Sequence, residues 1–175
     1  MYYLAIVCPQ AIDQKIGQFK QLMKDRFSCI VAMKSPAHVT LIAPFWFDEY
    51  REQQLVDALA SFHSDMDALT LNLAGFNHFN RSVLFVDMEA QPALEELRDQ
   101  LSKYFMTRFP GEIKKDLRPF HPHVTIATRD LKPADFIKAW DYFSHQEFIA
   151  SFTTRTISLL KLSPGKWNVF SEKQW

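Results

Sequence analysis

Two stretches of the chain share one motif: residues 118–129 read RPFHPHVTIATR, and residues 37–45 read AHVTLIAPF. Each contains His-Val-Thr followed by an aliphatic residue. Side chains on a β-strand point alternately to its two faces, so each His lies on the same face as its Thr. The polar groups offered to one cleft are the imidazoles of His38 and His123 and the hydroxyls of Thr40 and Thr125. Two unrelated strand histidines are the alternative, which the shared Val and aliphatic residue disfavour.

Apolar periodicity around these strands predicts a mixture of helices and strands. Four segments carry apolar residues at helical spacing, and Asp48 stands where the second of these helices would have its N-cap. The predicted helices span residues 11–27, 48–66, 92–109 and 133–145. The predicted strands span residues 2–8, 29–33, 38–45, 69–76, 83–88, 123–127, 148–152, 157–162 and 167–170. A hairpin is the simplest connection across residues 77–81.

The order strand, helix, motif strand, helix, strand occurs once before Phe76 and again after Val83. Such a half-chain repeat predicts two similar lobes, with the motif strands related by a pseudo-twofold axis. No linker or low-complexity segment divides the sequence, and its length suits one core. We therefore expect an α+β fold in which residues 1–175 form a single bilobal domain.

The chain has 20 Lys and Arg against 20 Asp and Glu, so its formal net charge is zero. A protein that grips long DNA or RNA by its backbone normally carries a basic stripe. If the substrate is a nucleic acid, we therefore expect a short RNA end or a nucleotide, and no DNA. Cys8 and Cys29 are too few for a disulfide framework and favour a reducing compartment. The start of the chain has no signal-peptide or membrane-span pattern, and we expect a cytoplasmic monomer.

Two histidines and two threonines favour phosphodiester chemistry. The sequence has no Gly-x-Ser-x-Gly elbow and no Walker-type loop. In-line displacement at phosphorus needs a base on the attacking oxygen and an acid on the leaving oxygen, and imidazole, with a reference pKa of about 6.5, serves as either. Threonine hydroxyls one strand step away can donate to the phosphoryl oxygens. This chemistry requires no cofactor and no metal.

Other residues near the motifs carry weaker expectations. His121 forms a His-x-His pair with the second motif histidine, but only His38 offers a third metal ligand, so His121 is better placed at the rim of the cleft. Phe45 and Phe79 are among the aromatic residues that flank the motifs, where each would either stack on a nucleobase or lie in the core, as most of the 16 Phe must. Arg129 would neutralise a second phosphate, unless it is a plain surface charge.

The paired motifs also resemble a known family. The segments HVTL at residues 38–41 and HVTI at residues 123–126 are similar to the duplicated His-x-Thr/Ser-x signature of the two-histidine (2H) phosphoesterase superfamily. That superfamily contains bacterial 2′–5′ RNA ligase-like proteins and cyclic nucleotide phosphodiesterases. Residues 118–123 resemble its usual run into the second motif, and residues 73–86 resemble its middle hairpin. The resemblance covers nearly the whole chain.

The resemblance implies two lobes, each a small antiparallel-rich sheet backed by helices, with the active-site cleft between them. It implies activity on 2′,3′-cyclic phosphates or 2′–5′ linkages, with His38 and His123 as acid and base and with Thr40 and Thr125 holding the phosphate. The chain departs from the family in lacking a basic residue at its start and in having Trp167 where Tyr is commoner. A nucleotide- or RNA-end-binding module with little or no turnover is the alternative function, which the intact motifs disfavour.

Overall fold

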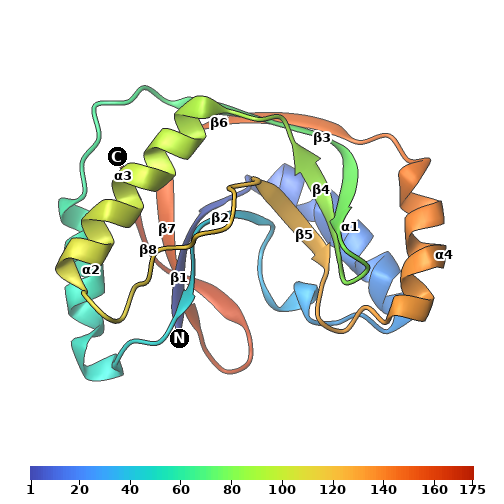
Figure 1. Cartoon of the computed structure of the whole chain (residues 1–175), viewed down its shortest axis with the longest axis horizontal. Helices are drawn as coiled ribbons and strands as arrows, with labels where there is room; N and C mark the ends of the chain where they lie inside the picture. The colour runs from blue at the N-terminus through green and yellow to red at the C-terminus, as the bar shows by residue number, and fades with distance from the viewer.

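A computed structural model describes residues 1–175, and it contains two four-stranded antiparallel sheets with helices packed around them (Figure 1). The first sheet has the strand order β2-β1-β7-β8, and the second has the order β5-β4-β3-β6. The strands are β1 (Tyr2–Val7), β2 (His38–Phe45), β3 (Leu69–Phe79), β4 (Val83–Met88), β5 (His123–Ala127), β6 (Ile149–Thr154), β7 (Thr156–Leu162) and β8 (Trp167–Gln174). This architecture confirms the predicted α+β fold with two lobes.

Two of the four α-helices cross between the two lobes. The α-helices are α1 (Gln10–Phe27), α2 (Glu52–Ser61), α3 (Pro92–Arg108) and α4 (Pro133–Ser144), and the 3₁₀ helices are η1 (Ala32–Lys34) and η2 (Glu49–Arg51). α1 follows a strand of the first sheet but packs against β5 of the second, whereas α3 follows a strand of the second sheet but packs against β2 of the first. This exchange ties the lobes together through a core of 42 buried residues. None of the helices has the length and apolar character needed to cross a membrane.

The two motif strands occupy equivalent places. β2 and β5 are each the edge strand of their sheet, next to β1 and β4, and they contact each other in the middle of the molecule (Figure 1). The predicted repeat is present as β1-α1-β2-α2-β3 and β4-α3-β5-α4-β6. The symmetry ends at the third strand, because β3 and β6 pair with each other in the second sheet. β7 and β8 fill the corresponding places in the first sheet.

The predicted strand at residues 29–33 is wrong. Ser28 ends α1 in the left-handed conformation, with φ 58°. The amides of Ile30 and Val31 then donate to Oδ2 of Asp130, at 2.6 and 2.8 Å. Because a side chain 100 residues from Ile30 takes the amides that a strand would need, the segment coils into η1 instead.

The predicted second helix is too long, whereas the other three agree with the prediction to within one residue at each end. Asp48 makes no side-chain cap, and the short helix η2 precedes α2. Phe62 leaves α2 in an extended conformation with its side chain buried. Ser64 is also buried, and its Oγ donates to Oε1 of Gln100 on α3 at 2.8 Å. These tertiary contacts end the helix where the apolar spacing alone would continue it.

Candidate active site

The His and Thr of each motif share one face of their strand, as the alternation predicts. The partly exposed residues are His38, Thr40, His123 and Thr125, and the buried ones are Val39, Leu41, Val124 and Ile126. The contact between β2 and β5 brings the four polar side chains to the junction of the lobes. Protonation of the second imidazole lowers the pKa of the first, His38, so the two rings lie within electrostatic range of each other.

Each motif histidine is held by the same kind of hydrogen bond, from its ring to the backbone carbonyl two residues earlier. His38 Nδ1 lies 2.8 Å from the carbonyl oxygen of Pro36, and His123 Nδ1 lies 2.7 Å from that of His121. A carbonyl oxygen only accepts, so Nδ1 of each ring donates its hydrogen. Nε2 of the neutral ring then keeps a free lone pair. Each imidazole is therefore fixed to accept a proton at Nε2 or, once protonated, to donate one from the same atom.

An aromatic ring from the neighbouring strand covers each histidine. Tyr3 on β1 has its ring centroid 4.9 Å from that of His38, and its hydroxyl lies 3.4 Å from His38 Nδ1. Phe85 on β4 lies 4.8 Å from His123, and Phe79 on β3 adds a second ring at 4.9 Å. These contacts restrict the rotation of both imidazoles and keep water from part of their surface.

Burial is the largest influence on both imidazoles. It lowers the pKa of His38 to about 4 and lowers the pKa of His123 by less. Charges act on both rings in both directions, since Lys20 lowers and Asp13 raises the pKa of His38, and His121 lowers and Asp87 raises that of His123. Asp87 lies opposite His123 in the β4–β5 ladder. Of the two rings, His123 therefore holds a proton more readily.

The two motif hydroxyls are free to bind a ligand. Neither Thr40 nor Thr125 donates its hydroxyl to any protein group, and both side chains are partly exposed. Each hydroxyl lies one strand step from its histidine, on the same face. An anion between the imidazoles could therefore accept a hydrogen bond from each threonine.

His121 lies just before β5 rather than on it. Its Nε2 is 2.8 Å from Oδ1 of Asp87, and its ring packs edge-on against Phe79 with centroids 5.4 Å apart. Its carbonyl oxygen accepts the hydrogen bond from His123 described above. No group of three or more His, Cys, Asp or Glu side chains is arranged to share a metal ion. His121 thus orients His123 from the rim of the site.

The other two predicted contacts differ in exposure. Phe45, at the opposite end of β2 from His38, is 7% exposed and packs in the core against Tyr2, with ring centroids 6.4 Å apart. It is therefore no surface on which a base can stack. Arg129 is exposed in the turn after β5, and its contact with a second phosphate stays a prediction. Only Phe79, of the predicted aromatic contacts, lies beside a motif histidine.

Four residues near the site were not predicted: Tyr3, Lys20, Phe85 and Asp87. Asp87 carried a usable signal, because it is a lone acid in the otherwise apolar strand β4. Tyr3 and Phe85 stand among apolar neighbours and resemble core residues, whereas Lys20 resembles any charged residue of an amphipathic helix. Only strand pairing and helix packing bring them to the histidines.

The chain matches known proteins over almost its whole length. A family model described as the 2′-5′ RNA ligase superfamily matches residues 8–166. The chain belongs to this superfamily. A candidate phosphoesterase of Geobacillus sp. strain WCH70 is 26% identical to it over 161 residues, which are 90% of this chain and 88% of that protein. A candidate phosphoesterase of Geobacillus kaustophilus is 23% identical over 172 residues, with 97% and 92% covered.

Solved structures share the fold of this 2′-5′ RNA ligase superfamily member. Escherichia coli LigT complexed with 3′-AMP matches it with a TM-score of 0.70 at 20% identity, over 98% of this chain and 95% of that chain. The protein TT0787 of Thermus thermophilus matches with a TM-score of 0.69 at 16% identity, again over 98% and 95%. At these identities the likeness concerns the fold alone, which is the two-lobed architecture described above.

Proposed function

We propose that this protein is a metal-independent phosphoesterase that opens 2′,3′-cyclic phosphate or 2′–5′ ribose phosphodiester bonds, at RNA ends or in nucleotides. The observation that carries the proposal is the pair of imidazoles, each with Nδ1 bonded to a backbone carbonyl and Nε2 free. A positioned acid and a positioned base are what in-line displacement at phosphorus requires. The complex of E. coli LigT with 3′-AMP, a protein of the same fold, supports a nucleotide as ligand.

The difference in pKa supports a division of roles between the two histidines. His38, whose pKa is lowered to about 4, is the base, and His123, which keeps a proton more readily, is the acid. With a 2′,3′-cyclic phosphate, water gives a proton to His38 Nε2 while its oxygen bonds to phosphorus. The P–O3′ bond breaks, and O3′ takes a proton from His123 Nε2. The product carries a 2′-phosphate.

The threonines stabilise the charge that develops on the phosphoryl oxygens. Thr40 and Thr125 stand one on each motif strand, so their hydroxyls approach the phosphate from both lobes. Donors aimed at an oxygen that gains charge in the transition state lower the barrier more than they stabilise the bound substrate. This places both hydroxyls in the chemical step as well as in binding.

Turnover of nucleoside 2′,3′-cyclic phosphates and of 2′–5′-linked dinucleotides, in the presence of a chelator, tests the proposal. We expect the wild-type protein to open the cyclic phosphates, with a 2′-phosphate product by phosphorus NMR. The double variant His38→Ala/His123→Ala should give none. His63→Ala is the matched control, because His63 is exposed and pairs only with Asp65. Tight binding of these compounds without product would instead favour the binding-module function.

A further inference from the structure

A pocket of about 370 Å³ adjoins the His38 side of the junction and has no part in the mechanism above. It lies between the N-terminal half of α1, the turn at η1 and the start of β8. Its lining includes Asp13, Gly17, Lys20, Lys34, Lys166 and Trp167. Pro36 also lines it, and the carbonyl oxygen of Pro36 holds His38 Nδ1. The pocket and the imidazole therefore share one turn of the chain.

Lys20 is a buried cation without a carboxylate partner. It is 5% exposed, its Nζ donates to the carbonyl oxygen of Ser35 at 2.9 Å, and it forms no ion pair. Burial lowers the pKa of Lys20, and the charge of Asp13 opposes that effect. An ammonium group has three N–H donors, and one is used here. A buried charge is costly unless an opposite charge accompanies it, so an anion in the pocket would satisfy Lys20.

The other charges around the pocket also favour an anion. Lys34 and Lys166 are exposed at its rim, and neither forms an ion pair. Asp13 is the one acidic residue of the lining, and its Oδ1 already accepts the amide hydrogen of Ala37 at 2.6 Å. Three lysines against one aspartate give the pocket a positive potential, in a protein whose formal net charge is zero.

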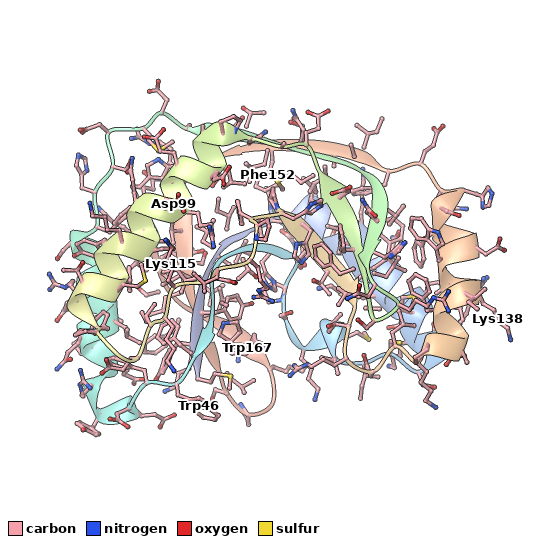
Figure 2. The ribbon with its side chains drawn as sticks, in the orientation of Figure 1. Trp46, Asp99, Lys115, Lys138, Phe152 and Trp167 are labelled. Atoms are coloured by element: carbon pink, nitrogen blue, oxygen red, sulfur yellow. The ribbon has the colours of Figure 1, made fainter.

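Aromatic contacts connect the pocket to the histidine pair. The ring of Trp167 lies edge-on to that of Tyr3 with centroids 4.6 Å apart, and Tyr3 covers His38 at 4.9 Å. Figure 2 shows Trp167 in the middle of the molecule, near the junction of the two sheets. The single ring of Tyr3 thus stands between His38 and the Trp167 wall of the pocket.

We propose that this pocket is a second phosphate-binding subsite, which holds an additional phosphate of the substrate whose reacting phosphate lies between the histidines. Lys20 and Lys166 bind its oxygens, and Trp167 packs against the sugar or base that joins the two phosphates. The inference rests on the proposed function for the identity of the reacting phosphate. The additional phosphate is either the 5′-phosphate of a cyclic mononucleotide or the next phosphodiester of an RNA end.

Three substrates distinguish these sources. They are a nucleoside 2′,3′-cyclic phosphate, the same compound with a 5′-phosphate, and a dinucleotide that ends in the 2′,3′-cyclic phosphate. We expect the additional phosphate to lower KM roughly ten- to a hundredfold, the range of charge-assisted hydrogen bonds. If only the 5′-phosphorylated compound has a lower KM, the subsite binds a terminal phosphate. If the dinucleotide has a lower KM, the subsite binds a phosphodiester. Equal KM values for all three substrates would overturn the inference.

Two variants test whether the lower KM for substrates with an additional phosphate depends on the pocket. Lys20→Met removes the buried charge, and Gly17→Leu fills the pocket, since a Cβ at Gly17 meets no atom within 4 Å and leucine suits a helix. Both should abolish the preference, and Gly17→Leu, which leaves the charge near His38 in place, should also leave kcat on the nucleoside cyclic phosphate unchanged. Lys138→Met is the matched control, because Lys138 is exposed on α4 and points away from the centre (Figure 2). A preference that survives both pocket variants would refute the subsite.

A binding measurement keeps the subsite testable if no substrate is turned over. Inorganic pyrophosphate is titrated into the wild-type protein while the Trp167 indole N–H and the Gly17 amide are followed by NMR. We expect both signals to shift with saturation, and the shifts to disappear in Lys20→Met. Unmoved signals, or shifts that persist unchanged in Lys20→Met, would contradict the subsite irrespective of whether the phosphoesterase activity is found.

Discussion

The two halves of the site hold their histidines in the same way but surround them differently. In both, Nδ1 is bonded to the carbonyl oxygen two residues earlier, a ring from the adjacent strand covers the imidazole, and a threonine follows on the same face. Around His38 the charged side chains are Lys20 and Asp13, whereas His123 has the His121–Asp87 pair beside it. The shared features fix the geometry, and burial, which lowers the pKa of His38 to about 4, makes the two rings unequal as bases.

The comparison suggests how a symmetric frame supports an asymmetric reaction. Duplicated motif strands bring two similarly held imidazoles to the junction of the lobes, and residues outside the motifs then shift their protonation in different degrees. These outside residues come from other elements, with Lys20 on α1 and Asp87 on β4. Changing the motif should therefore abolish activity, whereas changing the surroundings should alter its dependence on pH and leaving group.

The largest expected effect separates the two histidines by leaving group. We expect His38→Ala and His123→Ala each to lower kcat on a 2′,3′-cyclic phosphate by roughly a thousandfold, because each removes one proton transfer. On a phosphodiester with a p-nitrophenolate leaving group, which needs no proton, His123→Ala should recover most of the activity and His38→Ala should not. Steady-state kinetics on both substrates measures this. Equal recovery in the two variants would show that the roles are not divided as assigned.

The threonines test whether the two halves contribute equally to charge stabilisation. Thr40→Val and Thr125→Val keep the side-chain shape and remove one donor each, so we expect kcat to fall roughly a hundredfold in either. Thr70→Val is a matched control, because Thr70 is an exposed strand threonine bonded only to Thr153. A kcat that stays at the wild-type value in both motif variants would remove the hydroxyls from the chemical step.

Acid stability distinguishes His38 from an exposed histidine. Its pKa is about 4 in the folded protein against about 6.5 when unfolded, so the folded state binds fewer protons between these values. Its contribution is therefore fully present above pH 6.5 and is lost as the pH falls toward 4. Because the ring is partly exposed, solvent keeps the effect below its full value. We expect the wild-type protein to lose about 1–2 kcal/mol more unfolding free energy between pH 7 and 4.5 than His38→Gln loses.

Urea unfolding at several pH values measures this effect, with His63→Gln as the control. His63 is exposed, and its replacement should leave the pH dependence of stability as in the wild-type protein. If His38→Gln loses as much unfolding free energy between pH 7 and 4.5 as the wild-type protein, then the surroundings of His38 do not hold it neutral.

The smallest expected effect concerns the charge beside the acid. Asp87 raises the pKa of His123, so Asp87→Asn should lower that pKa and move the alkaline limb of the kcat/KM profile to lower pH. The acidic limb, which reports the base, should stay in place. Lys20→Met should instead move the acidic limb upward, since Lys20 lowers the pKa of His38. If Asp87→Asn moved the acidic limb and Lys20→Met moved the alkaline limb, His38 would be the acid and His123 the base. The two limbs report the apparent pKa values of the coupled pair.

The motif strands were predictable from the sequence because their pattern is local. A period of two, a shared His-Val-Thr core and adjacent proline residues define β2 and β5 with correct bounds. The faces of His38 and His123 follow from the same alternation. The half-chain repeat likewise predicts the order of elements through β6, since each helix shows its own apolar spacing.

The parts of the fold and of the site that the sequence did not predict depend on contacts between distant segments. Asp130 takes the amides of Ile30 and Val31, which no local pattern reveals. Phe45 flanks the first motif in sequence but lies at the buried end of its strand. The exchange of α1 and α3 between the sheets brings Lys20, itself a helix residue of unremarkable context, to the His38 side of the site.

The position of a bound phosphate tests the central claim most directly. A crystal structure of the wild-type protein with phosphate, at the lowest concentration that gives full occupancy, would locate the preferred anion. We predict an ion between Nε2 of His38 and Nε2 of His123, with the hydroxyls of Thr40 and Thr125 at hydrogen-bond distances of about 2.6–3.0 Å. An ion bound only where it touches neither imidazole would contradict a shared site built from the two motifs.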